Sequence, residues 1–151
     1  MDDTTLVEKA LAVRTHAYAP YSGFSVGAAL LGENGIVYPG CNVENAALSP
    51  GCCAERAAFF RAIADGERKF KKIAVVGGKA GEPAGSFCPP CGVCRQVMAE
   101  FCDPDTFLII LAKSPSGRKR ILLRDLFPMG FGKAEVSFEP GKSGKEASKS
   151  R

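Results

Sequence analysis

The stretch SVGAALLGENGIVYPGCNV, residues 25–43, decides the predicted fold because it carries the strongest hairpin signal in the sequence. Two apolar, strand-like runs lie on either side of Glu33-Asn34-Gly35, and an Asn-Gly pair between such runs is typical of a tight β-turn. We therefore predict two neighbouring antiparallel strands at this point of the chain.

Segments with helical and strand patterns lie on both sides of this hairpin. Upstream, Asp3 or Thr4 can cap a helix that runs to about Ala17. Downstream, the predicted elements are a helix over 52–65 ended by Gly66, a strand over 71–78, a helix over 91–101, a strand over 106–113, and a strand with a short helix around 120–128. Because helical crossovers connect the later strands, we predict one α/β layered domain in which these strands are parallel.

The composition is that of an ordinary globular domain. The 151 residues are 46% hydrophobic and 24% charged. The N-terminal segment is acidic, and no apolar run approaches the roughly 18 residues of a membrane span. These features predict a cytoplasmic protein with no membrane partner.

The net charge of +4 is concentrated at the C-terminal end. Residues 141–151, GKSGKEASKSR, hold four basic residues and one acidic residue, so they supply +3 of it and leave the rest of the chain nearly neutral. We predict a single domain over residues 1–138 and a basic, disordered tail over 139–151. A nucleic-acid-binding arm is the alternative interpretation of the tail.

The seven cysteines are clustered, and two stretches place them at predicted helix starts. An odd, clustered set in a reducing compartment favours metal binding or reactive thiols over disulfides. FCPPCGVCRQVMAEF, residues 87–101, puts Cys91 and Cys94 on one helical turn, with the spacing of tetrahedral zinc sites. GCCAERAAFF, residues 51–60, adds Cys53 at another helix start, one crossover earlier in the chain. Because one crossover returns the chain beside the first helix start, the three sulfurs can converge as metal ligands. Helix N-termini also stabilise thiolates.

Three protein ligands would leave a fourth zinc position open for water, which is the pattern of a catalytic site. Two other interpretations stay open at this point. Cys91 and Cys94 could form a redox dithiol, or a fourth protein ligand could close a structural zinc site. The candidates for that fourth ligand are His16, Cys41, Cys52, Cys88 and Cys102.

Two charged residues follow Cys53 closely enough to share its cavity. Glu55 can lie beside the metal without ligating it and can move protons between water and a leaving group. Three thiolates leave a zinc centre with a net negative charge, so a nearby cation is needed to draw off charge, and Arg56 is placed for that role. Glu55 therefore favours an enzyme, since a structural zinc has no use for a general acid or base.

Four motifs resemble those of the small zinc-dependent cytidine deaminases that form homotetramers: PYSGFSVGAAL, CNVENA, CAER at 53–56 and PCGVCRQ at 90–96. The match extends from about Tyr18 to Phe131, in the order and spacing of that family. It implies a three-layer α/β/α fold with a mixed five-stranded sheet, one zinc per subunit and a homotetramer with shared active sites. It also implies hydrolytic deamination of cytidine and deoxycytidine to uridine and deoxyuridine plus ammonia, as in pyrimidine salvage.

The resemblance assigns roles to individual residues. The zinc ligands would be Cys53, Cys91 and Cys94, and a zinc-activated hydroxide would attack C4 of the base while Glu55 shuttles protons. The implied substrate contacts are Phe24 on the base, Asn42 and Glu44 on the ribose hydroxyls, the backbone of Ala54 on the pyrimidine, and Phe131 reaching into a neighbouring subunit's site. A carboxylate at Glu44 would repel a phosphate, so a nucleoside is the expected partner rather than a nucleotide or nucleic acid.

The sequence also departs from that family. Leu48 stands where the family usually carries an aromatic residue, and Ser49-Pro50-Gly51 leads into the cysteines. The substrate range is therefore open, and a deaminase of a related aminopyrimidine nucleoside, such as a blasticidin-like antibiotic, is one alternative. A non-catalytic zinc-stabilised module is another. A second interpretation of Phe127 and Phe131 is that they pack on the core of the monomer.

Overall fold

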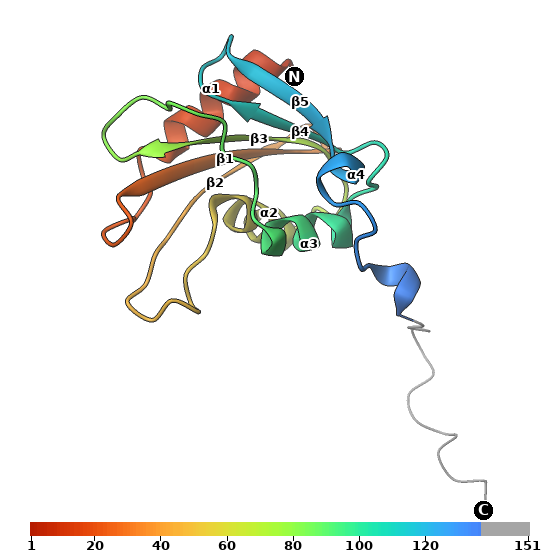
Figure 1. Cartoon of the computed structure of the whole chain (residues 1–151). Coiled ribbons are helices and arrows are strands. Elements are labelled where there is room, and N and C mark those ends of the chain that lie inside the picture. Colours follow the sequence, from red (N-terminus) through yellow and green to blue (C-terminus); the bar gives the residue numbers. More distant parts are fainter. Residues whose placement is uncertain (137–151) are drawn as a thin grey trace, which may run out of the picture.

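The computed structural model describes residues 1–136, which form a mixed five-stranded sheet with helices on both faces (Figure 1). Its elements are α1 (Asp3–Arg14), β1 (Phe24–Gly32), β2 (Val37–Cys41), α2 (Ala54–Ala64), β3 (Phe70–Lys79), α3 (Gly92–Phe101), β4 (Leu108–Ala112), β5 (Arg118–Leu122), α4 (Leu123–Leu126) and the 3₁₀ helix η1 (Lys133–Glu135). The predicted domain end at residue 138 and the predicted tail lie outside the described residues. Among the helices of residues 1–136, none combines the length and apolar character that a membrane crossing needs.

The predicted hairpin is confirmed as β1 and β2. The two strands pair antiparallel, with Leu31 opposite Val37 next to the turn. The backbone N–H of Gly32 donates to the carbonyl of Ile36 at 3.0 Å, which closes the loop. Gly35 has a φ of +82°, a conformation that glycine adopts without steric cost. The Asn-Gly signal thus specifies the register of these strands.

The strand order of the sheet is β2-β1-β3-β4-β5. Strand β1 pairs antiparallel with both β2 and β3, while β3 and β4 are parallel. The prediction of parallel later strands is correct for β3 and β4, which α3 connects, but wrong for β5, which pairs antiparallel with β4. Residues 113–117 are too few for a crossover, and the N–H of Lys113 donates to the carbonyl of Gly117 at 2.8 Å to form a second hairpin.

Helix α1 begins and ends earlier than predicted. Its N-cap is Asp2, whose carboxylate accepts a hydrogen bond from the backbone of Thr5 at 2.9 Å. Asp3 is instead engaged by two cations, Lys72 at 2.6 Å and Arg120 at 3.2 Å. The helix stops at Arg14 rather than Ala17, because the chain then turns so that the N–H of Tyr18 bonds the carbonyl of Asn42 at 2.9 Å.

Two hydrophobic cores lie on the two faces of the sheet, which makes three layers. Along β1, Ala28 and Leu30 face the core shared with α2 and α3, whereas Ala29 and Leu31 face the core shared with α1. Figure 1 shows α1 on one side of the sheet and α2 and α3 together on the other. A strand covered on both faces is apolar on both faces, which explains why β1 shows no polar alternation.

Close packing fixes α2 against β2. A Cβ atom at Gly40 would collide with the backbone of Ala54 and Ala58 in α2. Glycine therefore allows the strand to approach the helix more closely than any other residue would. This contact fixes the first turn of α2, where Cys53, Glu55 and Arg56 are found, relative to the end of β2.

Candidate metal centre and substrate pocket

The three predicted metal ligands come together at the N-terminal ends of two helices. Cys53 is the N-cap residue of α2, Cys91 is the N-cap residue of α3, and Cys94 lies on the first turn of α3. Their sulfur atoms all lie within 4.8 Å of one another, and Cys53 Sγ is 3.8 Å from Cys91 Sγ. Tetrahedral zinc with Zn–S bonds of about 2.3 Å holds its sulfurs about 3.8 Å apart, so the residues fit this metal.

The alternatives to an open metal site find little support in this geometry. Within residues 1–136, no fourth His, Cys, Asp or Glu joins the three-sulfur cluster. Of the five candidate fourth ligands, His16 lines a different pocket and Cys102 lies at the far end of α3. A redox dithiol made of Cys91 and Cys94 alone would leave unexplained why Cys53 packs against them.

The Cys53 thiol is poised to ionise. Its pKa is lowered to about 5, first because of hydrogen bonding with Cys94 and then because of hydrogen bonds from Arg56 and Cys91. The Arg56 guanidinium donates to Cys53 Sγ at 3.6 Å. The same hydrogen bond to Cys53, together with burial, raises the pKa of Cys94. A divalent cation bound among the sulfurs would favour thiolates at all three positions.

Glu55 is the buried carboxylate beside this cluster. It is 4% exposed, and this burial raises the pKa of its side chain to about 7, with a smaller contribution from the nearby Cys53. A carboxyl group with a pKa near the working pH can both accept and donate a proton. Glu55 is therefore suited to general acid and base chemistry next to the metal centre.

Arg56 contacts the metal centre and also lines a pocket. Its pKa is raised by the hydrogen bond to Cys53, so the guanidinium stays charged beside the sulfurs. Among the described residues, Arg56 Nε is the one buried side-chain nitrogen or oxygen atom without a hydrogen-bond partner. An unpaired buried donor costs about 1 to 3 kcal/mol, so a ligand that accepted this hydrogen bond would be stabilised.

A pocket of about 320 Å³ opens next to the cluster. Its lining joins Cys53 and Arg56 to Asn42 and Glu44, two of the predicted substrate contacts. The volume is within the range of small-ligand sites, at their lower end. One metal ligand and the predicted sugar-binding residues thus share one cavity, whose full lining is Tyr21, Asn42, Val43, Glu44, Asn45, Leu48, Gly51, Cys52, Cys53 and Arg56.

Backbone groups hold Asn42 and Glu44 in place. Asn42 Oδ1 accepts from the N–H of Val26 at 2.7 Å, and its Nδ2 donates to the carbonyl of Phe24 at 2.9 Å. Glu44 Oε1 accepts from the N–H groups of Tyr21 and Ser22, both at 3.1 Å. These bonds, that of Ser22 first, lower the pKa of Glu44, so it stays ionised and its other oxygen remains available to a ligand.

The other predicted substrate residues are placed less directly. Ala54 is fully buried at the start of α2. Phe24 does not line the 320 Å³ pocket, but its ring and Cys88 both lie against Gly77. Phe131 is 59% exposed and also lies outside this pocket, with its carbonyl accepting from Gln96 Nε2 of α3 at 2.9 Å. A single chain therefore does not bring the two phenylalanines into the pocket.

Sequence reasoning did not identify the backbone of Tyr21 and Ser22 as part of the site. These residues hold Glu44 through main-chain N–H groups, which any residue other than proline can supply. Arg14 was missed as well: although it ends α1, it is buried and donates to the carbonyls of Ser25 at 3.0 Å and Lys79 at 2.8 Å. The motif PYSGF, residues 20–24, contains Tyr21 and Ser22 and was the signal available for their role.

Comparisons with known proteins agree with this site. Residues 1–110 match the family model described as the cytidine and deoxycytidylate deaminase zinc-binding region. The chain belongs to this deaminase family. A cytidine deaminase from Sporosarcina psychrophila is 44% identical over 138 residues, which cover 91% of this chain and 97% of that relative.

Solved structures of the family share the fold. A cytidine deaminase from Burkholderia pseudomallei is similar with a TM-score of 0.78 and 44% identity, covering 87% of this chain and 100% of that one. A cytidine deaminase from Mycobacterium tuberculosis has a TM-score of 0.74 and 37% identity, covering 87% of this chain and 98% of that one. The predicted family and fold class are therefore confirmed.

Zinc is the cofactor of this deaminase. The matched region is the zinc-binding region of the family, and it contains Cys53, Cys91 and Cys94, the cluster positioned to hold a metal ion. Phe131 lies beyond the matched residues. The expectation of a zinc site at these three cysteines thus agrees with both the family and the geometry.

Proposed function

We propose that this chain catalyses the hydrolytic deamination of cytidine and deoxycytidine, giving uridine and deoxyuridine plus ammonia, as in pyrimidine salvage. The observation that carries this proposal is the buried carboxyl of Glu55 beside three sulfurs that fit zinc. One of these three cysteines, Cys53, lines the pocket that contains Asn42 and Glu44. The cytidine deaminases that this chain resembles over most of its length support it.

In this mechanism Glu55 moves the protons. When bound at Cys53, Cys91 and Cys94, zinc supplies Lewis acidity that activates water. Glu55 accepts one proton from the attacking water and delivers it to N3 of the pyrimidine. It then accepts the second proton from the new hydroxyl group on C4 and delivers it to the departing amine, so that water and cytidine become uridine and ammonia. Burial keeps the pKa of Glu55 near 7, which suits both the acceptor and the donor role.

Other residues bind the nucleoside in this proposal. Asn42 and Glu44 hold the sugar hydroxyls with the hydrogen-bonding capacity that their backbone partners leave free. The backbone of Ala54 orients the pyrimidine, and the ring of Phe24 packs on it. Arg56, which donates to Cys53 Sγ, limits the negative charge of the three thiolates.

Glu44 should make the enzyme selective for nucleosides. We expect purified, zinc-loaded protein to convert cytidine with a much higher kcat/KM than cytidine 5′-monophosphate, because the phosphate would approach the ionised Glu44. In Glu44→Gln, the loss of a charged hydrogen bond should lower kcat/KM for cytidine by roughly 10- to 100-fold. The ratio of kcat/KM for cytidine to kcat/KM for cytidine 5′-monophosphate should become smaller. The absorbance change on deamination measures both values.

A matched control for this substitution is Glu33→Gln, because Glu33 is exposed at the turn between β1 and β2 and does not line the pocket. Glu33→Gln should leave kcat/KM for both substrates unchanged. If the nucleoside-to-nucleotide ratio were the same in Glu44→Gln as in the unsubstituted enzyme, Glu44 would not be the residue that excludes phosphate. If neither cytidine nor deoxycytidine were converted while zinc was bound, a different aminopyrimidine would be the substrate.

A homotetramer with shared active sites is part of the proposal. Leu48, at the rim of the 320 Å³ pocket, is 87% exposed, and Phe131 is exposed as well. Large exposed apolar side chains near a pocket favour an interface between subunits. In a tetramer, Phe131 would reach a neighbour's site and complete the wall that a single chain leaves open.

Light scattering at micromolar concentration should give the mass of four chains, and a monomer would contradict this prediction.

Removing one aromatic contact is worth roughly 1 kcal/mol or more, so Phe131→Ala should raise KM for cytidine by about fivefold or more. Tetramers refolded from a mixture of Phe131→Ala and Glu55→Gln chains should contain sites with a normal KM. Failure to recover these sites would place Phe131 in its own subunit's site, whereas an unchanged KM in Phe131→Ala would place it outside every site.

We place the enzyme in the cytoplasm, with no nucleic-acid partner. All seven cysteines are free, and three of them must stay reduced to bind metal, which a reducing compartment ensures. If Glu44 binds the sugar as proposed, the phosphates on either side of that sugar in a polynucleotide would lie close to its carboxylate. The ionised carboxylate therefore acts against nucleic acid as it does against a single phosphate.

A further inference from the structure

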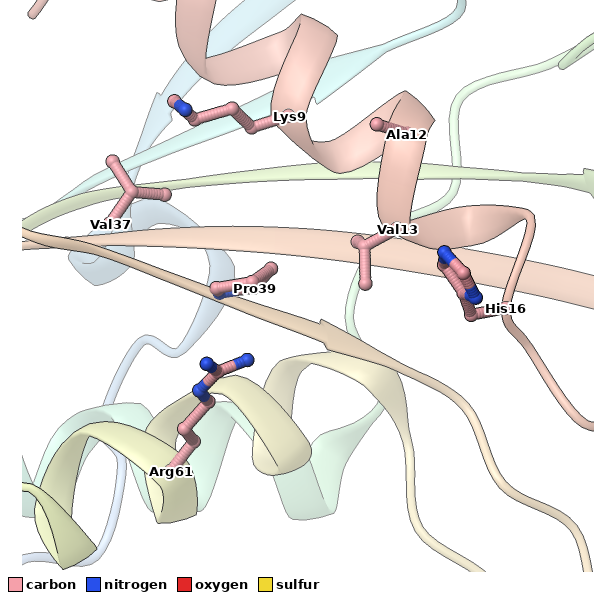
Figure 2. Close-up of a pocket in the computed structure, with 7 residues that line it drawn as sticks. All are labelled: Lys9, Ala12, Val13, His16, Val37, Pro39 and Arg61. Atoms are coloured by element: carbon pink, nitrogen blue, oxygen red, sulfur yellow. The ribbon is translucent and has the colours of Figure 1, made fainter.

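A second pocket, of about 530 Å³, lies between α1, β2 and α2 and shares no lining residue with the catalytic pocket. Figure 2 shows α1 above the edge strand β2, with Arg61 rising toward the strand from α2 below. The lining residues are Lys9, Ala12, Val13, His16, Val37, Pro39 and Arg61. None of them has a role in the proposed deamination.

Every ionisable side chain that lines this pocket is basic: Lys9, His16 and Arg61. Within residues 1–136, neither Lys9 nor Arg61 takes part in any ion pair. Elsewhere in the described residues, Lys72 and Arg120 are paired with the carboxylate of Asp3. The pocket thus concentrates positive charge without a carboxylate to balance it, which favours an anionic ligand.

The floor between the basic side chains is apolar. Val13 points from α1 toward the strand, and Pro39 lies on β2 between the two helices (Figure 2). Val37 extends this surface along β2. A small inorganic anion would leave these side chains uncovered, whereas an organic anion with a flat or apolar body would cover them.

Two macromolecular occupants fit this surface poorly. Pro39 has no backbone N–H, so the edge of β2 cannot pair fully with an added peptide strand. A second copy of the chain docked symmetrically on this pocket would bring Lys9 and Arg61 close to the same two residues of the other copy, and these like charges would oppose the contact. A small organic anion avoids both problems.

We propose that this pocket binds an organic phosphate of the nucleotide type, with the phosphates held by Lys9, His16 and Arg61 and the base on Val13, Val37 and Pro39. Its volume is within the range of pockets that hold such ligands. Arginine and lysine are the residues that proteins use for phosphate, the former in a bidentate manner. The chain then has one pocket that binds phosphate and one, the catalytic pocket, where Glu44 repels phosphate.

Calorimetric titration of the zinc-loaded protein with adenosine 5′-triphosphate tests this proposal, because the purine does not resemble the pyrimidine of the catalytic pocket. We expect one binding event per chain that saturating uridine does not displace. Inorganic triphosphate should bind at least tenfold more weakly than the nucleotide, because it leaves the apolar floor uncovered. Displacement by uridine, or equal affinity for inorganic triphosphate, would overturn the proposal.

Two kinds of variant locate the site. Lys9→Gln with Arg61→Gln should weaken nucleotide binding at least tenfold, and Ala12→Glu, an exposed helical position that adds a carboxylate to the pocket, should do the same. Lys69→Gln with Lys71→Gln removes the same charge elsewhere and should change affinity less than twofold. An equal loss of nucleotide affinity in the control pair would mean that net charge alone attracts the nucleotide, which would contradict a specific binding site in this pocket. Thermal unfolding of each variant verifies its fold.

Discussion

Glu55→Gln should lower kcat for cytidine by roughly 10²- to 10⁴-fold while zinc stays bound, which is the cost of losing a general acid and base. This range corresponds to about 3 to 5 kcal/mol of transition-state stabilisation. The amide has almost the volume of the carboxyl, so the buried position stays filled and the fold should persist. Zinc content by atomic absorption and initial rates at saturating cytidine measure the two halves of this prediction.

The control for this variant is Glu33→Gln, an exposed change of the same chemistry, which should retain full activity and zinc. A Glu55→Gln protein with near-normal kcat would remove Glu55 from the proton transfers. A protein that lost zinc would instead make Glu55 part of the metal site, although its carboxylate does not belong to the three-sulfur cluster. These outcomes also separate a catalytic zinc from a structural one, because a structural site would not depend on Glu55 for turnover.

The sequence was most informative where local patterns encode the chemistry. Each of the cysteine motifs places its ligands at a helix start, and a helix N-terminus is recognisable from a few residues. The Asn-Gly turn is likewise a local signal, and it determines the hairpin of β1 and β2. Cys53, Cys91 and Cys94 could therefore be predicted together, although 38 residues separate the first two.

Features that depend on distant segments could not be predicted in the same way. The sequence does not reveal that Asp3 is engaged by Lys72 and Arg120, which leaves Asp2 to cap α1. An arginine in the last turn of a helix normally faces solvent, yet Arg14 is buried because the ends of β1 and β3 offer it carbonyl groups. The basic pocket is of the same kind, since Lys9 and Arg61 become neighbours only when α1 and α2 pack around β2.

Removing a zinc ligand is expected to have the second large effect. Cys53→Ala, Cys91→Ala and Cys94→Ala should each lose most of the zinc and nearly all deaminase activity, because two thiolates hold the metal far less tightly than three. A metal whose free concentration is 1,000 times its Kd stabilises the folded state by about 4 kcal/mol. A variant that loses the metal loses this stabilisation, so its melting temperature should fall by on the order of 10 °C. Metal analysis and calorimetry of the purified variants measure both effects.

Cys52→Ala provides the matched control, because Cys52 adjoins Cys53 in the chain but lies outside the three-sulfur cluster. Partial burial raises the pKa of its thiol, so Cys52 is not prepared to act as a thiolate ligand. The Cys52→Ala protein should keep its zinc and lose little deaminase activity. If Cys52→Ala lost the metal and Cys53→Ala kept it, the ligand register would shift by one residue, and Glu55 would no longer have the Cys-x-Glu spacing that places it beside the site. Full zinc occupancy in Cys91→Ala would instead require another ligand to take its place, which no His, Cys, Asp or Glu of residues 1–136 is positioned to do.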